Sequence, residues 1–423
     1  MIKFYIQIII MGLLLYANRR NKNTWKTPSG FLLGIFFLAS VFAIPTIYLQ
    51  DFRTPQSDAY WIPMFEFLAL LLCFLIPYTK LDETEIKQIR LPSIRFLNLF
   101  SIFIIGISLY SIAYFSKSIL YIFSLNSLGD ARNALYEGES YVENGLANTI
   151  ASVGASMYVF ALLFFFIYNI LGIGKKKQIL LIIGSLSEPL HILSYVGRDG
   201  VVFWIFSFIF LFLFFSPYLS EIKYKEIKKY IIVGSILLTI PFLAISVSRF
   251  DSSNVGTFGS MFTYLGEGFV NGPLFMGIED KPYRSGACFP LYYQITNTTQ
   301  TIKSGIGGGM LQYGEWRSWT FSTFVTSLYI NVGLLGVLLI AIFSYVVQKG
   351  TLRFEYQDIS FSQMFIYILF FQVFSQGVFY FRQYTRGGNL FILMCFLLFF
   401  LFAILEKSGN NIYIYKIDEN ATE

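Results

Sequence analysis

Six arginines are the residues of this sequence best suited to bind an anion. Five of them lie close to the end of a long apolar segment and Arg284 lies in the middle of a loop, all on the side that holds few lysines. A guanidinium presents its N–H donors in a rigid fork that matches phosphate geometry, and a charge at a membrane boundary requires a partner. The pattern therefore predicts a site for a phosphate-bearing head group. The six are Arg198, Arg249, Arg284, Arg317, Arg382 and Arg386.

These arginines also have simpler interpretations. Arg198 lies in the turn Gly197-Arg198-Asp199-Gly200 and could be an interfacial residue paired with Asp199. Arg249 and Arg317 stand at the two ends of one loop, where they could clamp a diphosphate or simply anchor the aromatic belt. For the pair Arg382 and Arg386, ordinary anionic lipid is the alternative ligand.

The composition indicates a polytopic membrane protein. The 423 residues are 55% hydrophobic and 13% charged, and the mean hydropathy is +0.60. Soluble domains contain about 25% charged residues. The net charge of +6 is therefore expected to reflect membrane topology rather than affinity for nucleic acid. His191 is the only histidine, so a histidine-based metal site is not expected, and we predict no cofactor.

About eleven segments are long and apolar enough to span a bilayer, which takes about 20 residues. When they alternate in direction, the lysine-rich clusters all fall on one side, which the positive-inside rule assigns to the cytoplasm. The N-terminus is then outside and the C-terminus inside, and the first segment is a retained helix. The segments are 2–17, 31–49, 61–78, 97–114, 149–171, 179–196, 200–217, 230–248, 319–347, 361–381 and 388–405.

Two long loops fall on the outer side of this single membrane domain, which covers residues 1–423. The first covers residues 115–148 and carries Arg132. The second covers residues 249–318, is rich in glycine and aromatic residues, and includes Tyr313. Loops of this length are usually functional. Aromatic faces stack on sugar rings, and glycines let backbone amides approach a ligand closely.

Three carboxylates of the second loop are candidates for a general base. Transfer of a sugar to a hydroxyl is assisted by a group that removes the acceptor proton. Glu267, Asp280 and Glu315 could do so, although each could instead be the structural partner of an arginine. Glu188 and His191 lie inside an apolar segment, where polar groups are costly and often functional.

The chain resembles the bacterial polysaccharide repeat-unit polymerases, the Wzy-type enzymes of O-antigen and capsule synthesis. The likeness lies in the span count, in the outer segment of residues 130–138 and in the turn of residues 197–200. It extends to the late outer loop and the stretches 319–324 and 328–336 that follow it. The resemblance implies an all-α protein of the bacterial inner membrane with a GT-C-like glycosyltransferase architecture.

The resemblance also implies a reaction. A glycan on undecaprenyl pyrophosphate would be transferred, without metal, to a second lipid-linked repeat unit at the outer face. The arginines, with Arg132 and Tyr313, would bind the pyrophosphate and glycan, and arginine would stabilise charge on the departing pyrophosphate. Expected partners are this substrate, membrane lipid and a chain-length regulator protein.

Two other functions stay open. A flippase or transporter of lipid-linked oligosaccharide would carry charges along a pathway between two similar halves, whereas here they gather at one side. An O-antigen ligase-like transferase is the second alternative. The related ligases use a loop histidine, and no histidine occurs in the outer loops predicted here.

The topology is tested by reporter fusions. Fusions at Lys176 and Lys225 are expected to report a cytoplasmic location, because both lie in lysine-rich clusters, and a fusion at Gly305 an external one. A cytoplasmic signal at Gly305 would overturn the assignment of the late loop to the outer side.

Overall fold

The computed structural model describes most of the chain, and all statements below concern that part. Its helices occupy all eleven predicted segments. The described residues are 2–49, 61–81, 83–125, 141–142, 145–250, 256–278, 288–296, 312–313, 316–317, 321–352, 357–407 and 410–417.

The chain divides into two compact units, each assembled from segments far apart in sequence. Unit 1 contains Met1–Asp82, Phe250–Arg353 and Leu369–Asn389, and unit 2 contains Glu83–Arg249, Phe354–Ile368 and Leu390–Glu423. The helices α11 (Glu221–Phe250), α15 (Phe361–Gln376) and α16 (Arg386–Glu406) each have residues in both units. The prediction of one membrane domain over 1–423 stays a prediction.

Seven described helices are long and apolar enough to cross a membrane, and a bent pair of helices makes an eighth candidate. This is the helix content of a membrane protein. The pair is α6 (Leu146–Ser156) and α7 (Tyr158–Leu171), which meet at 42°. The predicted segment 179–196 is likewise two short helices, α8 (Lys175–Gly184) and α9 (Ser187–Leu193). Pro189 lies in the first turn of α9, where a missing N–H is tolerated. The count of eleven spans stays a prediction.

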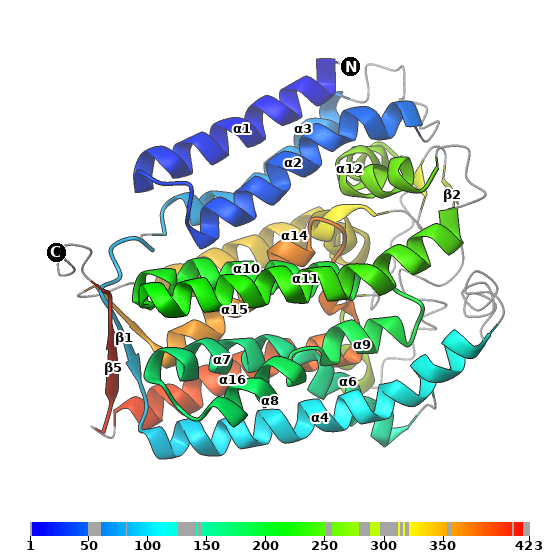
Figure 1. Cartoon of the computed structure of the whole chain (residues 1–423). Helices are drawn as coiled ribbons and strands as arrows, with labels where there is room; N and C mark the ends of the chain where they lie inside the picture. The colour runs from blue at the N-terminus through cyan, green and yellow to red at the C-terminus, as the bar shows by residue number, and fades with distance from the viewer. Residues whose placement is uncertain are drawn as a thin grey trace. The chain divides into compact units, whose positions relative to one another are not determined.

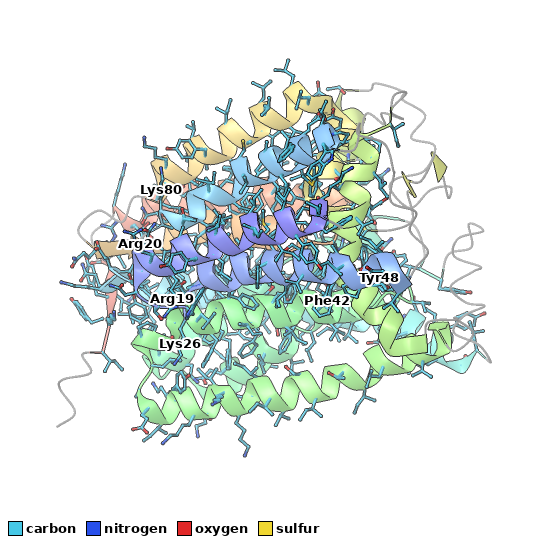
Figure 2. The ribbon with its side chains drawn as sticks, turned by 90° about the horizontal axis from the view of Figure 1, so that it is seen from above. Arg19, Arg20, Lys26, Phe42, Tyr48 and Lys80 are labelled. Carbon is cyan, nitrogen blue, oxygen red and sulfur yellow. The ribbon has the colours of Figure 1, made fainter. Side chains whose placement is uncertain are left out.

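Unit 1 is built around three N-terminal helices. These are α1 (Ile2–Lys22), α2 (Pro28–Leu49) and α3 (Trp61–Thr79). Figure 2 shows Arg19, Arg20, Lys26 and Lys80 at one end of them and Tyr48 toward the other. We call the end that carries Arg19, Arg20, Lys26 and Lys80 the basic end of unit 1. We call the end toward which Tyr48 lies the arginine-turn end.

A helix that the sequence did not predict lies at the arginine-turn end of unit 1. It is α12 (Gly256–Met276), inside the segment 249–318 that was predicted to be a loop. Its direction crosses that of α1 and α2 (Figures 1 and 2). It contacts α2 at Thr46, whose Oγ1 donates to Thr263 O at 3.1 Å, and α1 at Gln7, whose Nε2 donates to Phe269 O at 3.4 Å.

Glycines let α12 approach its neighbours this closely. A Cβ at Gly266 would lie 2.2 Å from the carbonyl oxygen of Phe42 on α2, and one at Gly268 would lie 2.8 Å from that of Val378. Two residues are about 200° apart around a helix, so α12 is held between backbone on opposite sides. Gly272 meets the ring of Phe67 on α3. The glycines and Pro273 of this segment are residue types typical of loops, which explains why the sequence did not predict α12.

The helix α14 (Thr323–Thr351) completes unit 1 and is broken at Gly333 (φ 70°, ψ −178°). Its first part is buried and its second part is largely exposed. The break divides the long predicted segment 319–347 into a buried half-helix and a longer helix. The smaller elements of unit 1 are α13 (Pro290–Ile295), β2 (Gln312–Tyr313), β3 (Trp316–Arg317) and the 3₁₀ turn η4 (Arg382–Tyr384).

Unit 2 packs four further helical segments around α4 (Ile94–Ser124), which contacts α6, α7, α8 and α9. Since α4 extends to Ser124 and α6 begins at Leu146, the predicted loop 115–148 is shorter at both ends. The helix α10 (Asp199–Phe215) packs on α7 and α9 and continues into the 3₁₀ turn η2 (Ser216–Tyr218).

A three-stranded sheet in unit 2 joins three loops that the charge pattern assigned to one side. Its order is β4 (Asp358–Ser360), β1 (Gln88–Leu91), β5 (Ile412–Tyr415), and Figure 1 shows β1 beside β5. Arg90 and Asp358 approach to 3.9 Å across it. Burial raises the pKa of the Asp358 carboxyl, and Arg90 opposes that shift. The sheet brings these three segments together, and their assignment to the cytoplasmic side stays a prediction.

The packing of α12 is tested by two alanine substitutions. Gly266→Ala is expected to destabilise the protein by about 1–3 kcal/mol, because the added Cβ would overlap the Phe42 carbonyl. The control is Gly34→Ala on α2, where an added Cβ meets nothing within 4 Å and alanine is the better helix former. Thermal unfolding in detergent measures both, and equal midpoints would contradict the described contact.

Candidate functional site

The structure describes the side chains of four predicted site residues: Arg198 in unit 2, and Glu267, Arg382 and Arg386 in unit 1. For Arg249, Tyr313 and Arg317 it describes the backbone. The remaining predicted residues lie outside the described part of the chain. They are Arg132, Asp280, Arg284 and Glu315.

Glu267 lies in the middle of α12 and is 2% exposed. One of its carboxylate oxygens accepts a hydrogen bond from the backbone N–H of Phe321 at 3.2 Å. Phe321 directly precedes the N-cap of α14, so Glu267 fixes the entry of that helix. In the described structure Glu267 therefore holds the chain in place, and its role as a base stays a prediction.

The start of α14 is also joined to the end of α15. The N–H groups of Ser322 and Thr323 both donate to Phe379 O, and that of Phe324 donates to Gly377 O at 2.7 Å. Donors at a helix N-terminus and acceptors after a helix C-terminus thus satisfy each other. This pairing places residues 377–379, and the η4 turn after them, beside the α14 entry and Glu267.

The η4 turn and the start of α16 carry two predicted site residues of unit 1, Arg382 and Arg386. Arg382 is half-buried and Arg386, at the start of α16, is exposed. The strand β3, which includes Arg317, contacts α12 and pairs with β2, where Tyr313 stands opposite Trp316. Unit 1 therefore brings together elements bearing Glu267, Tyr313, Arg317, Arg382 and Arg386.

Buried glutamines form a hydrogen-bonded row beside this turn, and none of them was among the site residues predicted from the sequence. Gln383 Nε2 donates to Gln376 Oε1 at 2.9 Å, and Gln376 Nε2 donates to Gln372 Oε1. Asn389 Nδ2 donates to the carbonyls of Gln383 and Cys288. The sequence does contain a sign of this row, because Gln372 and Gln376 are polar residues four positions apart in the apolar segment 361–381.

Part of the late loop is fixed to the same end. The backbone N–H of Cys288 donates to Asn331 Oδ1 at 3.0 Å, and the Cys288 thiol contacts Ser327 O. Burial raises the pKa of this thiol, so it stays protonated. Segment 288–296 therefore packs on the helices of unit 1.

In unit 2, Arg198 precedes α10 and reaches α11. Its Nη1 donates to Ser246 Oγ at 2.8 Å. Arg249 follows Ser246 by three residues, so it lies about one turn further along α11. The two arginines thus lie near each other at one end of this unit. That end is opposite the sheet, because η2, after α10, hydrogen-bonds through Tyr218 to Ile86 O next to β1.

Tight packing shapes the turn that presents Arg198. A Cβ at Gly197 would lie 2.5 Å from Ile192 Cγ2, and one at Gly200 would lie 2.9 Å from Ile192 Cβ. Val196 has a φ of 54°, a strained conformation for a β-branched residue. Both glycines are thus explained by the close approach of α9 to the start of α10, where Arg198 lies.

Glu188 and His191 form a buried pair on α9, the helix that precedes the Arg198 turn. His191 Nδ1 lies 3.3 Å from Glu188 Oε2, and the imidazole packs on Phe115 with ring centroids 4.5 Å apart. Among the described residues no group of three His, Cys, Asp or Glu could hold a metal ion.

A shared pyrophosphate pocket would require Arg198, Arg249, Arg284 and Arg317 to converge, and these contacts do not place all four. Arg198 and Arg249 belong to unit 2 and Arg317 to unit 1, and Arg284 lies outside the described residues. Their convergence stays a prediction. Comparison with family models, with curated proteins and with solved structures finds no match for this chain.

Substitutions at Glu267 test its role in holding α14. Glu267→Ala is expected to destabilise the protein by about 1–3 kcal/mol, because the buried N–H of Phe321 would lose its acceptor. Glu267→Gln keeps an acceptor oxygen and is expected to retain most of the stability. Thermal unfolding measures the stability of the two variants. An alanine variant as stable as the glutamine variant would exclude this role.

Proposed function

We propose that this chain polymerises oligosaccharide repeat units carried on undecaprenyl pyrophosphate, by glycosyl transfer at the outer face of the bacterial inner membrane. The proposal rests on the resemblance to Wzy-type polymerases and on one structural observation. In unit 1, Arg382 and Arg386 lie next to the segment that pairs with the α14 entry held by Glu267, and in unit 2 Arg198 lies at the end opposite the sheet.

The chemistry needs these charges. The acceptor hydroxyl attacks the anomeric carbon of the donor sugar, a base removes the hydroxyl proton, and the bond to the pyrophosphate breaks with its electron pair. Negative charge then grows on the departing pyrophosphate, where forked guanidinium donors stabilise it more than point charges do. We assign this task to the arginines, without metal or cofactor, and assign the base to one of Glu267, Asp280 and Glu315.

Two alternatives remain in other classes. A flippase or transporter of lipid-linked oligosaccharide would move the same substrate without changing it, and an O-antigen ligase-like transferase would give it to a different acceptor. An assay on the purified chain in proteoliposomes separates the three. Lipid-linked repeat units that grow into a ladder of polymers support polymerisation, and transfer to the far leaflet without extension supports a flippase.

The arginines are tested by conservative substitution. Arg198→Lys and Arg317→Lys are each expected to lower the polymerisation rate by about one to two orders of magnitude. A charge-assisted contact to a buried phosphate contributes about 1.5–3 kcal/mol, felt here in the transition state. Lys303→Ala is expected to have a smaller effect. If both arginine variants insert and polymerise at the unmodified rate, these residues are interfacial anchors.

A further inference from the structure

A row of aromatic rings lies beside the η4 turn of unit 1. Its members come from α12, from the entry of α14 and from the segment after α15. The centroids of neighbouring rings lie 5.1 Å apart for Tyr264 and Phe321, 5.7 Å for Phe321 and Tyr380, and 6.0 Å for Tyr380 and Tyr384. All four side chains are half-buried, so each keeps part of its surface accessible.

We propose that this row is a stacking platform for one sugar ring of the substrate, the ring that bears a phosphate. Three of the four rings are tyrosines, which combine an apolar face with a hydroxyl that can hydrogen-bond to a sugar. The turn that follows Tyr380 supplies Arg382 and Arg386, whose charge suits the attached phosphate. The platform deepens the proposed function and rests on it.

The main chain fixes the middle of the platform. Phe321 lies nearly parallel to Tyr380, at 19°, and its N–H is held by Glu267. Tyr380 N in turn donates to Gln376 O. A rigid ring costs little conformational entropy on binding. Glu267 is thus a positioning residue for the platform through Phe321.

An aromatic belt at the membrane boundary is the rival explanation. Belt residues stand singly along lipid-facing helix surfaces and need no contact with one another. The four rings here belong to three segments. Each ring packs against the next, from Tyr264 through Phe321 and Tyr380 to Tyr384. A belt also has no preference between a sugar phosphate and inorganic phosphate, whereas a stacking platform does.

Binding measurements on the detergent-solubilised full chain test the platform without any need for polymerisation. The probes are glucose 1-phosphate, galactose 1-phosphate, N-acetylglucosamine 1-phosphate and inorganic phosphate, followed by saturation-transfer NMR. The wild type is expected to bind at least one sugar phosphate more tightly than inorganic phosphate. Tyr380→Leu and Tyr384→Leu are expected to raise the Kd for that sugar phosphate about three- to tenfold, the value of one stacked ring, and to leave inorganic phosphate unchanged.

Two kinds of variant control the experiment. Tyr380→Phe and Tyr384→Phe keep the ring and are expected to bind the sugar phosphate within about twofold of the wild type. Tyr415→Leu removes a ring from the exposed stacked pair Tyr413 and Tyr415 on β5, outside unit 1, and is expected to have no effect. Unchanged elution on size exclusion shows that each variant is folded.

The outcomes separate this inference from the proposed function. Leucine variants that bind like the wild type, or a wild type that binds no sugar phosphate better than inorganic phosphate, overturn the platform even if the chain polymerises. Ring-dependent binding in a protein that extends no lipid-linked repeat unit supports the platform and overturns the polymerase.

Discussion

The close packing of α12 against backbone on two sides is the contact on which the arginine-turn end of unit 1 depends. Lipid tails are as apolar as leucine, so helices in a membrane gain little from burying large apolar side chains against one another. They gain instead from close approach, which small residues allow. Gly266 and Gly268 bring α12 against α2 and the segment after α15. The position of α12 against these neighbours then determines where Glu267 lies. Because Glu267 accepts the N–H of Phe321, it also determines where Phe321 lies.

A second constraint is that buried backbone and side-chain polar groups need partners where water is absent. In unit 1, the start of α14 and the segment after α15 satisfy each other's backbone groups. The carbonyls of Gly377 and Phe379 take the first N–H groups of α14, and Asn331, just before the break at Gly333, takes the N–H of Cys288. Irregular backbone is thus confined to places where another segment satisfies it.

The sequence located the helical segments because they depend on composition. The three segments that the charge pattern placed together do form one sheet. The sequence could not place α12, since buried Thr263, Glu267 and Asn271 lower its hydropathy and its glycines resemble loop residues. Nor could it find the ring row. Tyr264, Phe321 and Tyr380 are more than fifty residues apart from one to the next, and α12 brings the first of them to the second.

The two ends of unit 1 differ in what surrounds their charged residues. At the basic end, Arg19 stacks on Trp25 at 4.9 Å, and Lys22 donates to Ser29 and to Tyr78 O. Those contacts stabilise helix termini and suit a role in orientation. At the other end, Arg382 and Arg386 flank buried glutamines and half-buried rings. Forked donors beside apolar faces match a ligand that is at once anionic and cyclic, and that combination is what points to a sugar phosphate rather than to lipid alone.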